Sequence, residues 1–343
     1  MNVSADKAVL RLSLGVGLAV LIAYGWALPM PYMVCLMSVL VLCKPGPPLP
    51  LLKGAIIALL CAALVAAGVL MVPLLEHYAL TGIVLTAVLL YGLFFMGLRR
   101  ANPLTMVLVI AFALVPVLGV ADQGLVGMLA LTLAVGLATG MLVSAVSHAF
   151  FPDPVAAAAA RPVAPVPERE TAAWIALRAT VVVMPVFVLA LTDPSFYMAA
   201  ILKSVALGQQ AGETDARSAG REMVGSTLMG AWIAALVWLG LSLWPVLWML
   251  MLWLMAAALW AGAGIFGTRR TAFRPSFWSN ALVTTLILLG PAIEDSASGK
   301  GVFEASAVRV ALFVGVALYA WGTVWMLERW RGGRAGALLP EYH

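Results

Sequence analysis

Charged residues are scarce in this chain of 343 residues, since Asp, Glu, Lys and Arg together make up 10% of it. Soluble globular domains contain about 25% charged and about 45–50% apolar residues, whereas 64% of this chain is apolar. The composition therefore excludes an ordinary water-soluble fold. It also argues against a nucleic-acid partner, because the net charge of +5 is divided among many short polar segments and forms no single basic face.

Cysteine and histidine are equally scarce, with three residues of each. Cys35, Cys43 and Cys61 lie within or at the end of apolar stretches, and no CxxC motif is present, so neither a disulfide framework nor a metal site is predicted. The chain lacks a GxSxG motif, a P-loop and a GxGxxG motif that opens a helix after a strand. His148 and Asp153 have the HxxxxD spacing of some acyltransferases, but no phosphate-binding glycine loop follows. We therefore expect no enzyme activity, no cofactor and no ATP hydrolysis by this chain.

Long apolar stretches, bounded by proline, glycine or charged residues, fill most of the sequence. A membrane-spanning helix needs about 20 apolar residues, so there is room for about twelve spans and little for a soluble domain. The predicted spans are 8–27, 31–44, 51–75, 79–98, 103–121, 124–150, 171–192, 195–210, 221–244, 246–267, 275–293 and 304–328. The second and eighth are short, and we expect them to tilt, to break or to line a cavity. The predicted fold class is an all-α integral membrane protein.

The positions of Lys and Arg indicate how the spans are oriented. Four of the 20 cations fall inside predicted spans, namely Arg11, Arg178, Lys203 and Arg309. If the N terminus is cytoplasmic, fifteen of the other sixteen lie on the cytoplasmic side, and Lys300 alone lies outside. A miscount by one helix would scatter these charges over both faces. The bias therefore supports both the count of twelve spans and the location of both termini in the cytoplasm.

The two halves of the sequence share landmarks in the same order. The matched pairs are Arg11 with Arg178, Pro31-Tyr32-Met33 with Phe196-Tyr197-Met198, Gly97-Leu98-Arg99-Arg100 with Gly267-Thr268-Arg269-Arg270, Pro103 with Pro275, and Pro116 with Pro291. The predicted organisation is a first six-helix repeat at 1–151, a Pro- and Ala-rich cytoplasmic linker at 152–170, a second six-helix repeat at 171–330 and a cytoplasmic tail at 331–343. Because six is an even number, the two repeats would be parallel.

The stretches 11–42, 97–103 and 150–154 resemble the fusaric acid resistance and aromatic acid exporter superfamily of bacterial inner-membrane proteins. The likeness is to the short members, and this chain lacks the large cytoplasmic domain of the others. The resemblance implies six-helix units, location in the bacterial inner membrane, and export of small, often aromatic, carboxylates. It also implies a periplasmic adaptor of the membrane fusion type as a partner.

Charge inside a span costs about 2.5–3.5 kcal/mol per group on insertion scales, so each such cation needs a reason. Arg178 and Lys203 lie on consecutive spans joined by the tight Asp193-Pro194 turn, each roughly 10 Å from the cytoplasmic side. Two cations at one depth indicate an anion between them, a carboxylate or a phosphate. Arg11 occupies the matching place in the first half. The alternative for each is a side chain that reaches the headgroup region with its charged end.

Tyr32 and Tyr197 occupy matching places after the proline turns that begin the second and eighth spans. Each is a candidate to stack on, or to hydrogen-bond, an aromatic acid near the outer mouth, and the alternative is an ordinary interfacial aromatic. Asp193 is a candidate outer proton site, with capping of the turn before Pro194 as the alternative. No Asp or Glu is expected deep inside a span, so a proton relay through buried carboxylates is not expected.

Together these observations predict an inner-membrane exporter of small organic, often aromatic, carboxylates, embedded in the lipid bilayer and assisted by a periplasmic adaptor. Arg178, Lys203 and Arg11 would hold the carboxylate, and Tyr32 and Tyr197 would contact the ring. The alternatives are a passive organic-anion channel or permease, and a membrane subunit that docks an adaptor without transporting anything. The sequence leaves open whether the units pair into homodimers.

Overall fold

The structure is a computed structural model that describes residues 3–43, 68–100, 104–152, 167–213, 216–297 and 302–337, with single positions between 54 and 63. Over these residues the chain is helical and has no strand. Eight of the described helices are long and apolar enough to cross a membrane. The prediction of an all-α, multi-pass membrane protein is therefore confirmed at this level.

The first half of the chain forms a series of helices joined by short turns. These are α1 (Val3–Gly25), α2 (Pro31–Leu42), the 3₁₀ turn η1 (Gly68–Leu70), α4 (Met71–His77), α5 (Ala79–Arg100), α6 (Leu104–Ala121) and α7 (Gln123–Phe150). Local chemistry explains where they begin. Pro31 occupies the first turn of α2, where its missing N–H costs nothing. Asp122 caps α7, because its Oδ1 accepts a 2.8 Å hydrogen bond from the Gly124 N–H.

The second half contains longer helices. These are α9 (Arg169–Thr192), α10 (Pro194–Glu213), α11 (Ala216–Leu243), α12 (Leu247–Ile265), α13 (Pro275–Ala297) and α14 (Val302–Ala337). Apart from 51–75, every predicted span coincides with a helix; most ends differ from the prediction by up to five residues, and α14 continues nine residues past the predicted end at 328. Most of 51–67, with Cys61, lies outside the described residues, as do 153–166 of the predicted linker and 338–343 of the predicted tail.

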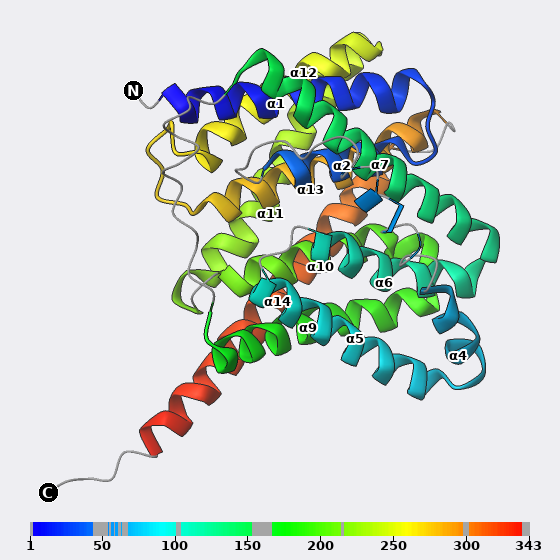
Figure 1. The fold of residues 1–343 in the computed structure, drawn as a ribbon, viewed down its shortest axis with the longest axis vertical. Helices are drawn as coiled ribbons and strands as arrows, with labels where there is room; N and C mark the ends of the chain where they lie inside the picture. The colour runs from blue at the N-terminus through cyan, green and yellow to red at the C-terminus, as the bar shows by residue number, and fades with distance from the viewer. Residues whose placement is uncertain are drawn as a thin grey trace, which may run out of the picture.

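Helices from the two halves pack against each other throughout the bundle. The first helix, α1, lies against α12, and its Ser13 hydroxyl donates a 3.0 Å hydrogen bond to the Met255 carbonyl. The corresponding α9 packs against α5 of the first half. Figure 1 shows α1 and α12 along one edge of the bundle and α5 and α9 toward the opposite edge, with α2 and α13 between them. The halves are thus interlocked.

The short helices lie inside the bundle. In α2, residues 32–39 are all buried, and α2 packs against α7 and α13. Gly136 and Gly140 of α7 allow the close approach, since a Cβ atom on either would lie 3.0–3.2 Å from α2 backbone atoms. In α10, residues 199–208 are buried. Of the eight candidate spans, α13 is the most buried.

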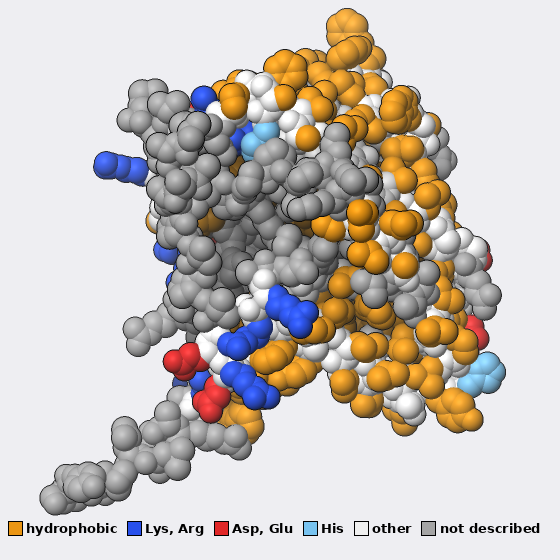
Figure 2. Space-filling view, viewed as in Figure 1, with side chains coloured by type: hydrophobic (Ala, Val, Ile, Leu, Met, Phe, Trp, Pro, Cys, Tyr) orange, Lys and Arg blue, Asp and Glu red, His pale blue; other side chains and the backbone are white. Residues whose placement is uncertain are grey.

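The described surface suits a lipid environment. Large apolar side chains such as Trp232, Leu239 and Trp248 are exposed, and hydrophobic side chains cover much of the face on the right of Figure 2. Lys and Arg side chains gather on the left of that view, the side on which Figure 1 shows the beginning of α1 and the end of α14. Lys and Arg side chains are therefore concentrated toward one end of the helices on this face.

Candidate functional site

Lys203 of α10 is fully buried, and it is among the largest side chains that are completely shielded from solvent. Its Nζ donates a 2.6 Å hydrogen bond to Thr284 Oγ1 and a 3.4 Å hydrogen bond to Asn280 Oδ1, both on α13. Within the described part of the chain, no carboxylate lies within ion-pair distance of Nζ. The partners of this buried amine are therefore neutral oxygen atoms.

The contacts of Lys203 continue into a polar cluster that joins α10, α11 and α13. We call Lys203, Gln210, Glu222, Ser226, Asn280 and Thr284 the polar cluster; each is at most 5% exposed. Asn280 Nδ2 donates to Ser226 Oγ at 2.6 Å and to Gln210 Oε1 at 2.9 Å. Gln210 Nε2 in turn donates to the Glu222 carbonyl at 3.1 Å. These hydrogen bonds hold Gln210, Ser226 and Asn280 in fixed orientations.

A small pocket of about 70 Å³ opens beside the polar cluster. It is lined by Leu40 and Cys43 from the end of α2, Ala206, Gln209 and Gln210 from α10, and Ser276, Ser279, Asn280 and Val283 from α13. The pocket therefore lies where the first half meets the second. It has room for several water molecules and for no larger ligand without movement of the helices around it.

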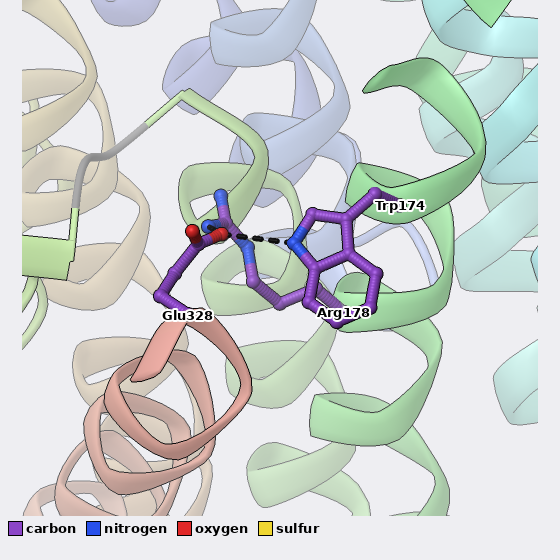
Figure 3. Close-up of polar contacts among 3 residues, drawn as sticks. All are labelled: Trp174, Arg178 and Glu328. Carbon is purple, nitrogen blue, oxygen red and sulfur yellow. Dashed lines mark hydrogen bonds and ion pairs between the residues drawn. The ribbon is translucent and has the colours of Figure 1, made fainter. Parts of the chain in front are cut away.

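Arg178 of α9 is buried and already binds a carboxylate of the chain itself. Its Nη1 lies 2.9 Å from Oε1 of Glu328 on α14, and the Trp174 indole N–H donates to the same oxygen at 2.9 Å (Figure 3). Trp174 precedes Arg178 by one helical turn, so both donors project from one face of α9. The three residues tie the first helix of the second half to the last. That Arg178 binds a substrate carboxylate stays a prediction.

Arg11 is 6% exposed, and its Nη1 donates a 3.2 Å hydrogen bond to the carbonyl of Phe151, the C-cap residue of α7. Lys7, one turn earlier on α1, donates to the next carbonyl, that of Pro152, at 3.0 Å. Cations at the C terminus of a helix satisfy its last carbonyls and interact favourably with its dipole. These contacts fasten α1 to the end of α7, and a substrate role for Arg11 stays a prediction.

Tyr32 connects the matched landmarks of the two halves. It is 5% exposed, and its hydroxyl lies 3.9 Å from the sulfur of Met198 on α10. On its other side lies α13, where Gly290 leaves no room for a Cβ atom beside the Tyr32 side chain. Tyr197 is half-buried, and its ring meets that of Phe196 edge to face at 4.8 Å. Contact of either tyrosine with a substrate ring stays a prediction.

Asp193 has the geometry of a helix cap. Its Oδ1 accepts a 3.1 Å hydrogen bond from the Phe196 N–H, and its carbonyl accepts one of 3.1 Å from the Tyr197 N–H. These bonds begin α10 after the turn. Asp193 is exposed, and its role as an outer proton site stays a prediction.

One acid that the sequence did not mark is buried. Glu222 is 1% exposed and lies in the second turn of α11, near the end of the candidate span Ser218–Leu243, in a helix that packs against α13. The sequence does contain a signal, since Glu222 and Ser226 are four residues apart and so share one polar face of an apolar helix. Similarly, α13 continues to Ala297 and includes Asp295, which pairs with Arg309 at 2.7 Å.

Comparison with family models, with curated proteins and with solved structures finds no match to this chain. The likeness to the aromatic acid exporters therefore stays a resemblance of short motifs. Within the described residues, no group of three or more His, Cys, Asp or Glu side chains is placed to hold a metal ion. The polar cluster and the pocket beside it are therefore the candidate functional site.

Proposed function

We propose that this chain is a membrane transporter that exports small organic carboxylates, and that Lys203 binds the carboxylate. The observation that carries the proposal is the complete burial of Lys203 among neutral partners. A buried ammonium group is costly unless it is paired with an opposite charge, and the described surroundings supply none within ion-pair distance. Lys203 is not among the described residues that line the pocket, but its acceptor Asn280 is. A carboxylate that enters the pocket and takes the place of Asn280 at Nζ would supply that charge and form a strong, charge-assisted hydrogen bond.

The groups around the pocket suit a carboxylate. Asn280 and Gln210 line it and carry amide N–H donors, and Ser276 and Ser279 add hydroxyl groups. The pocket is too small for an aromatic acid in this conformation, so binding requires α2 to move relative to α10 and α13. Transporters built from two repeats place their substrates at such an interface and open it by moving one repeat against the other.

The packing of the helices supports a parallel repeat, which we include in the proposal. In the predicted correspondence α1, α2, α5, α6 and α7 match α9, α10, α12, α13 and α14. The contact of α1 with α12 then has its counterpart in α9 with α5, and α2 with α13 has its counterpart in α10 with α6. The contact of α2 with α7 matches that of α10 with α14. These reciprocal contacts are what a twofold axis along the membrane normal requires.

Location in a bacterial inner membrane, with both termini in the cytoplasm, is also part of the proposal. It is supported by the cations that gather on the side where α1 begins and α14 ends. An aromatic substrate and a periplasmic adaptor rest on the family resemblance.

The test is efflux of radiolabelled benzoate from preloaded proteoliposomes containing the full chain. We expect Lys203→Gln to lower efflux at least tenfold with normal insertion, and Lys203→Arg, which keeps the charge, to retain part of it. Lys7→Gln serves as the control, because Lys7 donates to the carbonyl that follows α7 and is not among the described residues that line the pocket. Wild-type efflux by a folded Lys203→Gln protein would overturn the proposal.

A second candidate is a membrane subunit that transports nothing. It is favoured by the pairing of Arg11 and Arg178 with acceptors of the chain itself. It predicts that no carboxylate moves through proteoliposomes that contain the purified chain alone. The third candidate, a passive anion channel, predicts currents that reverse at the equilibrium potential of the anion and ignore a pH gradient.

A further inference from the structure

Arginine and aromatic side chains alternate where α11 begins, α12 ends and α13 begins. Arg269 lies in the turn between α12 and α13, and its guanidinium carbon is 4.6 Å from the ring centres of both Trp260 and Trp278. The Trp278 ring lies 6.2 Å from that of Phe273, over which the guanidinium carbon of Arg221 sits at 5.2 Å. We call these residues the arginine–aromatic cluster. Because the ring faces attract the cations, both guanidinium groups are held in place.

The turn that carries Arg269 is fixed at both ends. Gly267, with a φ of +72°, follows α12, and the Arg269 N–H donates a 3.0 Å hydrogen bond back to the Ala263 carbonyl. Toward α13, the Thr271 hydroxyl accepts a 3.3 Å hydrogen bond from the Trp278 indole N–H. The turn and one of the two indole rings on Arg269 are therefore positioned before any ligand binds.

The Arg269 side chain is half-buried, and among the described residues its guanidinium has no hydrogen-bond acceptor. Its contacts are with two ring faces, so the N–H groups around its edge are left to donate. The next residue, Arg270, is exposed and likewise has no acceptor in the described part of the chain. A planar guanidinium group with unused donors matches the oxygen atoms of a phosphate group in a bidentate manner.

Positive charge exceeds negative charge around the cluster. Of the described residues at these three helix ends, Glu222 is the one acid, and its Oε1 accepts a 3.5 Å hydrogen bond from the Arg274 backbone N–H. The cations are Arg221, Arg269, Arg270 and Arg274. One carboxylate can balance one of them, so the remaining charge attracts an anion to this corner of the bundle.

The surroundings of the cluster favour a lipid as the source of the phosphate. All three helices are candidate membrane spans, so their ends lie where the bilayer meets water. Next to the cluster, the ring of Trp232 lies 6.3 Å from that of Trp260, and Trp232 is 55% exposed. Leu228, one turn earlier on the same face of α11, is 50% exposed. A phosphate at the arginines therefore has an exposed apolar surface beside it that acyl chains can cover.

We propose that the arginine–aromatic cluster is a binding site for an anionic phospholipid, whose phosphate is held by Arg269 and Arg270 and whose acyl chains lie along Trp232. The site is separate from the pocket beside Lys203 and does not depend on carboxylate transport. It has a consequence for that region, because Asn280 of the polar cluster follows Trp278 by two residues on α13. A bound lipid that fixes Trp278 also fixes the start of the helix that carries the partners of Lys203.

The test uses the purified full chain in detergent with equal amounts of phosphatidylglycerol and phosphatidylcholine that have the same acyl chains. Native mass spectrometry should show the wild-type protein retaining phosphatidylglycerol with about tenfold preference, the value of one charge-assisted hydrogen bond. Arg269→Lys keeps the charge without the planar fork, so it should lose most of the preference. Arg329→Gln is the matched control and should keep the preference, because Arg329 is exposed and lies over a single ring on α14 at 5.4 Å.

Hydrogen exchange of the wild-type protein tests the site without any variant. Nanodiscs of phosphatidylglycerol should slow exchange at 266–274 relative to nanodiscs of phosphatidylcholine, and should leave exchange unchanged at 244–246, at the other end of α12. Equal retention of the two lipids, equal losses in Arg269→Lys and Arg329→Gln, or exchange at 266–274 that ignores the lipid would overturn the proposal. Displacement of phosphatidylglycerol by an equal concentration of water-soluble glycerol phosphate would show a site for free phosphate and overturn the assignment to a lipid.

Discussion

At the residue scale, a single carboxylate oxygen of Glu328 accepts from two donors on α9, the Arg178 guanidinium and the Trp174 indole. The Arg178 side chain is 5% exposed and that of Glu328 is 29% exposed, so the pair is shielded from water mainly on the arginine side. Removal of the acid would leave a buried guanidinium without its counter-charge. The cost of that change exceeds the value of the pair itself.

Glu328→Gln should therefore lower the free energy of unfolding by about 1–3 kcal/mol, because a buried donor loses its charged acceptor. Trp174→Phe, which removes one neutral donor, should lower the free energy of unfolding by about 1 kcal/mol. Thermal unfolding of the purified protein in detergent measures both. In the double variant Arg178→Gln/Glu328→Gln the loss should be smaller than the sum of the single losses, and additive losses would contradict a direct pair.

The burial of cations is the part of the site that could be predicted from the sequence. Arg11, Arg178 and Lys203 stand out as charges within apolar runs, and each is at most 6% exposed. Their partners could not be predicted. Glu328 follows Arg178 by 150 residues, and only tertiary packing of α14 on α9 brings them together. Asn280 and Thr284 resemble ordinary polar residues of a span until α13 is placed against α10.

At the element scale, the close contact of α2 with α13 depends on a residue without a side chain. Gly290 of α13 faces Tyr32, and a Cβ atom added there would overlap the tyrosine side chain. The same two helices line the small pocket beside the polar cluster. Extra volume at Gly290 would therefore force apart the helices that meet where the two halves join.

Gly290→Ala should lower the free energy of unfolding by about 1–3 kcal/mol through overpacking. Gly315→Ala on α14 is the matched control, because nothing lies within 4 Å of the added Cβ. Gly315→Ala should leave the free energy of unfolding unchanged or raise it by about 0.5–1 kcal/mol, because alanine has less conformational freedom than glycine in the unfolded chain. Thermal unfolding of the two purified variants in detergent compares their stabilities. Equal effects at both positions would argue against tight packing of α13 on α2.

Proline and charge predicted most helix ends, because both act locally on the backbone. The apolar run 51–75 is the exception, since its described portion contains the short elements η1 and α4, with Pro73 in the first turn of α4, where proline is tolerated. Hydropathy also ended the predicted span 275–293 before the end of α13 at Ala297. Glu294 and Asp295 suggested a loop, but the pairing of Asp295 with Arg309 on α14 keeps these residues helical.

At the scale of the whole molecule, the distribution of Lys and Arg predicts which helix ends lie on the same side of the membrane. Glu168 precedes α9 and lies near the cytoplasmic linker of the proposed topology, whereas Glu76 near the end of α4 lies on the outer side. Both side chains are exposed, so cysteine at either position would be open to a water-soluble reagent.

In a cysteine-free background, Glu76→Cys should react with a membrane-impermeant maleimide in intact spheroplasts. Glu168→Cys should react only after the membrane is permeabilised, because the proposed topology, based on the positive-inside bias, has it in the cytoplasm. Labelling is measured by mass shift of the purified protein. Reaction of both, or of neither, in intact cells would contradict the proposed orientation.

The packing of α1 against α12 has a consequence for the order in which the bundle assembles. α1 is synthesised before α12, so Gly17, which approaches Met255, and Leu12, which approaches Gly262, find those neighbours only after the intervening helices have been made. Until then lipid or an insertion factor has to cover that side of α1. α1 therefore completes its packing only when α12 arrives, with α13 and α14 still to follow.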